Sequence, residues 1–396
     1  MSRRHLSIFL ITFISSAGCT AEQADLCVAA ADHVGACFDT EPPAVTGECT
    51  DEEFAAEVLE TPCEELSSLS FKGVSARSLL CDTLGIFCDA APLGPAPQGS
   101  PARYPIVLAH GFNASTSLWG FHPDIVDALR ADGHLVYTAE VAPYKSVADR
   151  AEDLAAEIDT ALAMFGADKV NIIAHSMGGL DTRYLISSLG YGDRVASLTT
   201  ISTPHRGSFV ADIGMGLTND SMDAALNALA ELLARAITRD ELAQDSDLRA
   251  ALRDLSEAQS VEFNATQLDD PDVYYQSWAG VSNVGRIPGP FDFEQCTAEG
   301  GQWLLHDDIG AHDSFNALLL PLAAMVAHGV ELRPNDGLVM VESARWGQFR
   351  GCIPADHIDE IGGLFQNTSV GTDPNTGFDP VRFYRNNVFE LAALGF

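Results

Sequence analysis

The sequence predicts an α/β fold, with a mostly parallel sheet covered by helices on both faces, preceded by a small disulfide-rich helical domain. Apolar runs of strand length alternate with helical patterns from residue 102 onward, and such alternation is typical of parallel sheets. Six cysteines are concentrated between residues 27 and 88, and a stretch rich in proline and glycine follows them. We therefore expect a cysteine-rich domain at 19–92, a linker at 93–101 and a larger domain at 102–396.

Residues 1–18 have the pattern of a secretory signal peptide. Arg3 and Arg4 precede an apolar run at 6–14, which is too short to span a membrane, and small residues follow up to Cys19. The junction Ser-Ala-Gly-Cys at 16–19 resembles the lipobox of bacterial lipoproteins, in which the cysteine becomes acylated. We predict export, either to the exterior or to a membrane anchor on acylated Cys19. An ordinary cleavage site beside an incidental cysteine is the alternative.

The cysteines are expected to form disulfides in an exported protein. Of nine cysteines, eight remain when Cys19 is set aside, and an even number can pair completely. No spacing matches the Cys-x-x-Cys pattern of a zinc site. Three disulfides would stabilise the small domain, whereas Cys296 and Cys352 belong to the large region and are expected to pair with each other.

The large domain contains five apolar segments of strand length. They are 106–109, 135–141, 170–174, 195–201 and 273–278. Between the second and the third lies 147–165, where Leu154, Ile158 and Leu162 recur at helical spacing. These segments give the expected order of strands and helices.

The net charge excludes one class of partner. The chain has 22 Lys and Arg against 56 Asp and Glu, which gives a formal charge of -34. Nucleic-acid binding depends on basic side chains that displace counterions from phosphates. We therefore expect no nucleic-acid partner, and the acidic surface favours solubility.

A catalytic pattern lies at the end of the third apolar segment. Residues 174–178, Ala-His-Ser-Met-Gly, stand between this strand and a helical segment at 180–189. In the α/β-hydrolase fold such a turn, the nucleophile elbow, exposes a serine hydroxyl on a strained backbone. Ser176 is therefore the candidate nucleophile. The alternative is a turn that simply requires small residues.

A base and an acid for this serine are expected nearer the C-terminus. A serine hydroxyl needs a base to accept its proton and an acid to orient that base, and the fold supplies them in the order Ser, Asp, His. His357 is the only histidine after Asp336, which lies in the turn sequence Asn-Asp-Gly at 335–337. We expect both to form a triad with Ser176, against the alternative of a plain turn aspartate and a surface histidine.

An oxyanion hole requires two backbone N–H groups where negative charge develops. One is expected from Met177, directly after the nucleophile. The other is expected from Phe112, because the first strand runs into Ala-His-Gly-Phe at 109–112 and Gly111 permits a close approach.

Six segments together are similar to a known enzyme family. They are 104–112 (YPIVLAHGF), 169–184 (KVNIIAHSMGGLDTRY), 201–208 (ISTPHRGS), 275–280 (YQSWAG), 335–339 (NDGLV) and 357–361 (HIDEI). In this order they resemble the secreted triacylglycerol lipases of the Pseudomonas and Burkholderia type. The resemblance covers most of 102–396 and implies an α/β-hydrolase fold with Ser176, Asp336 and His357 as its triad.

The resemblance also implies a structural calcium ion, whereas the chemistry itself needs no cofactor. In that family two aspartates and backbone carbonyls bind the ion near the histidine loop, and calcium prefers such oxygen ligands. Asp359 matches one aspartate and Asp313 aligns with the other. The rivals of Asp313 are Asp292, Asp307 and Asp308. The carbonyls would lie near Gly363 and Asn367.

A lid is expected at about 209–240. Apolar residues recur there at helical spacing from Met222 to Ile237, with polar residues on the other faces. In the family this region covers the site and opens at a lipid–water interface. A helix packed on the core is the alternative.

The sequence thus predicts an esterase for apolar acyl chains, foremost a triacylglycerol lipase acting on lipid at an interface. A short-chain esterase, a phospholipase or a polyester hydrolase on the same scaffold is the enzymatic alternative. A surface lipoprotein that binds lipid or a partner without catalysis is the non-enzymatic one. Some members of the family require a folding chaperone, so such a partner is a further candidate.

Overall fold

The computed structural model describes residues 97–112, 121–215, 247–303, 312–328, 331–363, 370–373 and 376–396, with four single positions before residue 97. The chain divides into two compact units, Met1–Asp89 and Ala90–Phe396. The predicted signal peptide, Cys19 and the six clustered cysteines lie outside the described residues. The second unit carries the site and is described below.

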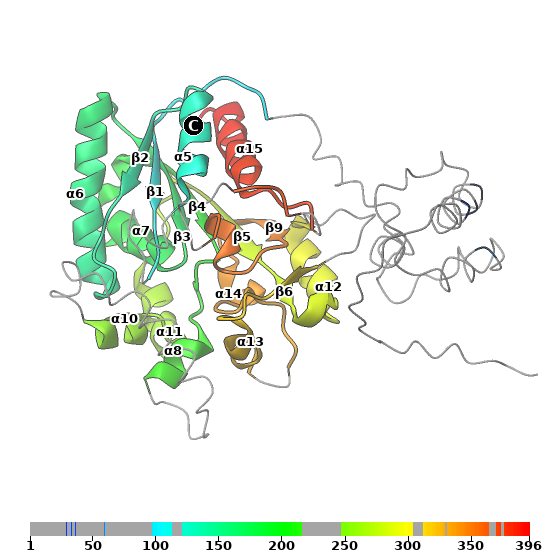
Figure 1. Ribbon diagram of the computed structural model, residues 1–396. Helices are drawn as coiled ribbons and strands as arrows, with labels where there is room; N and C mark the ends of the chain where they lie inside the picture. The colour runs from blue at the N-terminus through cyan, green and yellow to red at the C-terminus, as the bar shows by residue number, and fades with distance from the viewer. Residues whose placement is uncertain are drawn as a thin grey trace, which may run out of the picture. The chain divides into compact units, whose positions relative to one another are not determined.

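A seven-stranded parallel sheet forms the centre of this unit (Figure 1). In spatial order its strands are β2 (Val136–Ala139), β1 (Ile106–Ala109), β3 (Val170–His175), β4 (Val195–Ile201), β5 (Tyr274–Gly280), β9 (Gln348–Ile353) and β7 (Gln302–Trp303). Strands β3 and β4 are buried along their whole length, as expected for parallel strands covered on both faces. The predicted α/β class with a parallel sheet is confirmed, whereas the predicted disulfide-rich domain lies almost entirely outside the described residues.

Helices cover both faces of the sheet (Figure 1). On one face lie α5 (Pro123–Ala131) and α15 (Pro380–Ala393), and on the other α6 (Val147–Phe165) and α7 (Met177–Ser187). Leu129 of α5 shares a buried cluster with Ile106 of β1, whereas Leu154 of α6 shares one with Val107. Alternate residues of β1 therefore face opposite layers.

Local sequence explains where the long helix begins and ends. The Ser146 side chain accepts a hydrogen bond from the Asp149 amide before α6, and Gly166 adopts the left-handed conformation after it. The helix has the predicted bounds, and the five predicted strands are found with ends that differ by at most two residues. Strand β9 was not among them, because its sequence QFRGCI mixes polar and apolar residues.

Shorter elements gather at one end of the sheet (Figure 1). They are α8 (Phe209–Gly214), α10 (Leu248–Asp254), α11 (Glu257–Thr266), α12 (Asp292–Thr297), α13 (Leu320–Val326), α14 (Val341–Ala344), β6 (Ser282–Asn283), paired with β8 (Asp313–Ser314), and the short 3-10 helices η3 (Val284–Arg286), η4 (Ala298–Gly300) and η5 (Asp359–Ile361). The 3-10 helix η1 (Tyr191–Asp193) lies instead at the opposite end, where β3 and β4 begin. The expected disulfide between Cys296 of α12 and Cys352 of β9 is present. It joins this group of elements to the sheet.

Only the beginning of the predicted lid lies within the described residues. Helix α8 covers 209–214, and its Val210, Ala211 and Ile213 are buried. This stretch therefore packs into the core, while 216–240 lies outside the described residues. Among the described helices, none is long and apolar enough to cross a membrane.

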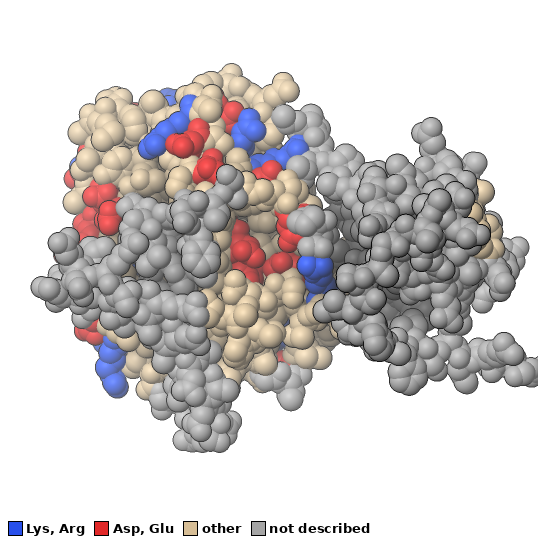
Figure 2. Space-filling model, viewed as in Figure 1, with Lys and Arg blue, Asp and Glu red and all other residues tan. Residues whose placement is uncertain are grey.

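The charged surface reflects the composition. Asp and Glu side chains recur across the described part of the face drawn in Figure 2. Two of the arginines are themselves paired with carboxylates, Arg385 with Asp132 and Arg194 with Asp159. The surface is therefore acidic, in keeping with the formal charge of -34.

Candidate active site

The turn after β3 holds a serine in a strained conformation. Ser176 lies between the end of β3 and the start of α7 with φ 55° and ψ -132°, a region that non-glycine residues rarely adopt. Its neighbours must be small. A Cβ on Gly111 would lie 2.5 Å from the Ser176 Cβ, and one on Gly178 would lie 2.6 Å from the Ala109 carbonyl oxygen. The packed turn therefore fixes the direction of the Ser176 hydroxyl.

Three of the predicted residues form one hydrogen-bonded chain. His357 Nε2 lies 2.9 Å from Ser176 Oγ, and His357 Nδ1 lies 2.7 Å from Asp336 Oδ2. Ser176 is 8% exposed, His357 7% and Asp336 0%, so the serine and the imidazole keep a little accessible surface while the carboxylate has none. Side chains separated by up to 181 positions are thus brought together.

The carboxylate of Asp336 is held by its own turn. Its Oδ1 accepts hydrogen bonds from the Leu338 and Val339 amides at 2.8 and 2.7 Å. The His357 amide donates to the Asp336 carbonyl oxygen at 3.0 Å, so backbone and side chain both connect the two loops. Oδ2 is left to face His357 Nδ1, which favours the tautomer with a proton on Nδ1.

The two residues predicted to supply an oxyanion hole both adjoin groups packed at the serine: Met177 follows Ser176 in the chain, and Phe112 follows Gly111, where a Cβ would lie 2.5 Å from the Ser176 Cβ. Met177 is the first residue of α7 and is fully buried. Phe112 follows β1, and its ring packs edge-on against Tyr144 with centroids 5.3 Å apart. Helix N-termini carry free N–H groups, which suits Met177 for binding negative charge.

A buried arginine holds the end of β1, and sequence reasoning missed it. Arg150 of α6 is fully buried, pairs with Asp181 of α7 at 2.8 Å, and donates to the His110 carbonyl oxygen at 3.1 Å. Burial raises the pKa of Asp181 to about 6, and the Arg150 charge opposes this. The sequence did contain a clue to it, because Arg150 lies four positions before Leu154 and therefore on the apolar side of the predicted helix.

His110 is neutral next to this ion pair. Burial, and then the charge of Arg150, lower the pKa of His110 to about 3. Its Nε2 accepts a hydrogen bond of 3.3 Å from the Val141 amide. The backbone between β1 and Phe112 is therefore fixed on two sides, by Arg150 and by the segment after β2.

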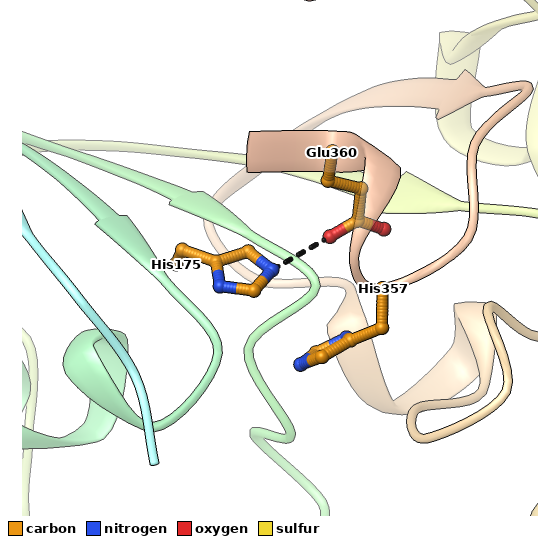
Figure 3. Close-up of side chains that lie close together, drawn as sticks. All are labelled: His175, His357 and Glu360. Atoms are coloured by element: carbon orange, nitrogen blue, oxygen red, sulfur yellow. Dashed lines mark hydrogen bonds and ion pairs between the residues drawn. The ribbon is translucent and has the colours of Figure 1, made fainter. Parts of the chain in front are cut away.

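Behind the imidazole lies a second buried pair, also missed from the sequence. His175 Nε2 lies 3.0 Å from Glu360 Oε2, and the His175 ring packs against that of His357 (Figure 3). Burial lowers the pKa of His175 well below its usual range and raises that of Glu360 well above its own. His175 directly precedes Ser176 and Glu360 lies three residues after His357, and this proximity in the sequence was the available signal.

The two predicted calcium aspartates lie in one acidic group. Asp313, Asp356 and Asp359 each offer an oxygen within 4.8 Å of the others. Burial raises the pKa of Asp313 to about 7 and that of Asp359 to about 8, and neighbouring carboxylates add to both shifts. Such repulsion favours a bound cation. Asp356 was not predicted, although it directly precedes His357.

Asp292, the described rival of Asp313, has other surroundings. The carboxylate of Asp292 accepts hydrogen bonds from the Gly289 amide and the Asn283 side chain at 2.8 and 3.0 Å. Asp307, Asp308 and the predicted carbonyl position Asn367 lie outside the described residues. Gly363, the other carbonyl position, follows η5, and its amide donates to the Ile358 carbonyl oxygen at 3.0 Å.

The chain is similar to known hydrolases over most of its length. A family model described as the alpha/beta hydrolase fold matches residues 104–277. A triacylglycerol lipase of Vibrio cholerae is 32% identical over 74% of this chain and 89% of its own length. A triacylglycerol lipase of Burkholderia plantarii is 30% identical over 80% of this chain and 94% of its own length.

Solved structures agree on the fold. A metagenomic carboxyl esterase matches 75% of this chain and 79% of its own with a TM-score of 0.51, at 19% identity. This likeness concerns the fold, and the lipase sequences carry the family. The chain belongs to the bacterial triacylglycerol lipases of the α/β-hydrolase superfamily, a family of carboxylic ester hydrolases.

Proposed function

We propose that the protein hydrolyses esters of apolar acyl chains, foremost triacylglycerols, with Ser176 as nucleophile. The observation that carries the proposal is the hydrogen-bonded chain from Ser176 through His357 to Asp336. A serine hydroxyl becomes a competent nucleophile only when a base can take its proton. The names of the related lipases support the choice of triacylglycerols.

In the proposed first half-reaction Ser176 Oγ attacks the ester carbonyl carbon. His357 Nε2 accepts the hydroxyl proton and then gives it to the alcohol as the carbon–oxygen bond breaks. Asp336 keeps the imidazole in the required tautomer and stabilises its cationic form. An acyl group is then bound to Ser176.

The amides of Phe112 and Met177 are proposed to bind the oxyanion that forms on the carbonyl oxygen. The support is the position of Met177 at the start of α7 and the fixed strand end before Phe112. Removal of one such donor typically costs about 100- to 1000-fold in kcat. Water then attacks the acyl group with His357 again as base, which releases the acid and restores Ser176.

The first test is hydrolysis of p-nitrophenyl esters from acetate to palmitate, below and above their solubility limits. The wild type and Ser176→Ala are compared. We expect activity that depends on Ser176, favours long chains and rises at the interface. Activity restricted to short soluble esters would keep the mechanism and exclude the lipase. Equal activity in Ser176→Ala would exclude the proposed nucleophile.

We further infer that the acidic group binds a calcium ion. The donor set supports it, because calcium prefers carboxylate and carbonyl oxygens and three carboxylates converge there. Asp313 and Asp359 would hold the ion, and Asp356 lies close enough to contribute. The ion would fix the loop that carries His357, so its role is structural. Isothermal titration with calcium, against Asp313→Asn, tests the site.

We infer that the protein is exported, on the basis of the signal pattern at 1–18 and of the eight cysteines that can pair. Acylation of Cys19, a membrane anchor and a folding chaperone remain predictions from the sequence. Mass spectrometry of the protein purified from a bacterial envelope would detect the acyl group on Cys19. An unmodified N-terminus would exclude the anchor.

A further inference from the structure

One buried carboxyl group beside the site takes no part in the proposed ester chemistry. Glu360 is 0% exposed and lies in η5, three residues after His357. Its Oε2 lies 3.0 Å from His175 Nε2 at the end of β3, and its Oε1 accepts a hydrogen bond of 2.5 Å from Ser202 Oγ, just after β4. The side chain therefore joins the loop of the base to the ends of two central strands, and Figure 3 shows its bond to His175.

A glycine at the end of β5 makes room for this carboxyl. A Cβ on Gly280 would lie 1.8 Å from Glu360 Oε1, and the Gly280 amide donates to Ser202 Oγ at 2.9 Å. Ser202 has a φ of 45°, which is strained for a serine and persists only where the surroundings fix it. The ends of β3, β4 and β5 thus enclose Glu360 on three sides.

The hydrogen bond between His175 and Glu360 links the segment that carries the nucleophile to the segment that carries the base. His175 directly precedes Ser176, and its ring packs against that of His357 with centroids 4.5 Å apart. Neither residue takes part in the proposed proton transfer between Ser176 Oγ and His357 Nε2, although Glu360 also shares a side-chain hydrogen bond with Asp336. Their influence on catalysis therefore acts through the position of His357.

We propose that Glu360 is a positioning residue, which with His175 and Ser202 fixes the 2.9 Å spacing between Ser176 Oγ and His357 Nε2. The inference rests on the proposed function, because it takes His357 to be the base. Asp336 orients the imidazole through Nδ1. Glu360 instead holds the loop of His357 against the ends of β3 and β4 through its hydrogen bonds with His175 and Ser202. A displacement of about 1 Å near reacting atoms can cost about 100-fold in rate.

A carboxyl group that merely completed the core would behave differently. Its loss would lower the thermal midpoint and the fraction of folded enzyme, but each folded molecule would keep its kcat. The two roles are separated by kcat per active site, counted by titration with a fluorophosphonate, and by KM for a short soluble ester.

The test compares Glu360→Ala, Ser202→Ala and the conservative Glu360→Gln. Gln keeps an acceptor oxygen for Ser202 and an N–H for His175. We expect kcat per active site to fall about 100-fold in Glu360→Ala and about 10-fold in Ser202→Ala, with KM changed less than about twofold. Glu360→Gln is expected to stay within about fivefold of the wild type.

Ser197→Ala is the matched control. Ser197 is a buried serine on β4, five positions before Ser202, and its Oγ donates to Asn171 Oδ1 at 2.7 Å. It pairs with a neighbouring strand away from the ends that surround Glu360. Its kcat per active site is expected to stay within about twofold of the wild type, although the loss of a buried hydrogen bond lowers stability.

Crystal structures of Ser202→Ala and Glu360→Gln give a readout that does not depend on activity. We expect the distance between Ser176 Oγ and His357 Nε2 to exceed about 3.5 Å in the first and to stay at hydrogen-bond length in the second. Ser202→Ala carries the test if Glu360→Ala does not fold.

Unchanged kcat and an unchanged distance in Ser202→Ala, in an enzyme that still requires Ser176, would overturn the positioning role alone. Activity that does not require Ser176 would overturn the proposed function instead. The two crystal structures would then still decide whether Glu360 positions His357.

Discussion

The two sides of the proposed site are held by different arrangements of charge. On the oxyanion side, Arg150 and Asp181 form one buried ion pair. On the histidine side, the carboxylates of Asp313, Asp356 and Asp359 converge. Burial disfavours charge in both places, and a buried charge needs an opposite one nearby. The oxyanion side supplies both a positive and a negative charge from its own side chains. On the histidine side only negative charges meet, so we expect a bound cation to balance them.

Position in the fold explains this difference. Arg150 and Asp181 lie on α6 and α7, two neighbouring helices on the same face of the sheet. The three carboxylates lie on short segments around β8 and η5, which have few regular backbone hydrogen bonds. Two helices thus fix one half of the proposed site through their own side chains, while we expect the loops of the other half to need a bound ion.

The largest effect is expected from Asp336→Asn, on the histidine side. The variant keeps the shape of the side chain but favours the wrong tautomer of His357, so we expect kcat/KM to fall by about 1000- to 10,000-fold. Steady-state hydrolysis of a short soluble ester measures it. Asp159→Asn, at an exposed pair with Arg194, is the control. A loss below about tenfold would mean that another group orients His357.

A smaller effect is expected from Arg150→Lys, on the oxyanion side. Lysine keeps the charge beside Asp181 but lacks the planar set of donors that also reaches the His110 carbonyl oxygen. We expect kcat to fall about 10- to 100-fold with KM nearly unchanged, because the Phe112 amide loses its fixed direction. Arg194→Lys, on the surface, should leave kcat unchanged. An equal loss in both variants would remove the special role of Arg150.

The smallest effect is expected from calcium, and it depends on pH. Burial raises the pKa values of Asp313 and Asp359 to about 7 and about 8, above the usual value near 4. Without the ion, the unfolded chain loses these protons first, so stability falls as pH rises from about 4 to about 8. A bound cation cancels this loss.

We therefore expect the rise in thermal midpoint on adding calcium to grow from pH 5 to pH 8, by a few degrees. Scanning calorimetry with calcium or with a chelator measures it. In Asp313→Asn the calcium-dependent rise should shrink, whereas Asp159→Asn should retain it. A rise that is independent of pH would show that these carboxylates do not bind the ion.

Much of the fold could be predicted because its signals are local. The central strands are apolar throughout, since both of their faces are covered, and helix α6 carries a helical repeat and a serine cap. Ser176 could be predicted for a similar reason, because an elbow needs small residues at fixed spacing. The residues that support the site could not, because Arg150, Glu360 and Asp356 acquire their partners only when distant segments meet.

By itself, the sequence determined the α/β class, the order of strands and helices, the candidate nucleophile, acid and base, and the pairing of Cys296 with Cys352. These follow from periodicity, from the chain order that the fold imposes and from the small number of candidates. Only the tertiary structure decided which carboxylates face each other, that Arg150 holds the end of β1, and that Glu360 lies close to His357. Burial and contact between distant segments set these features, and no local pattern records them.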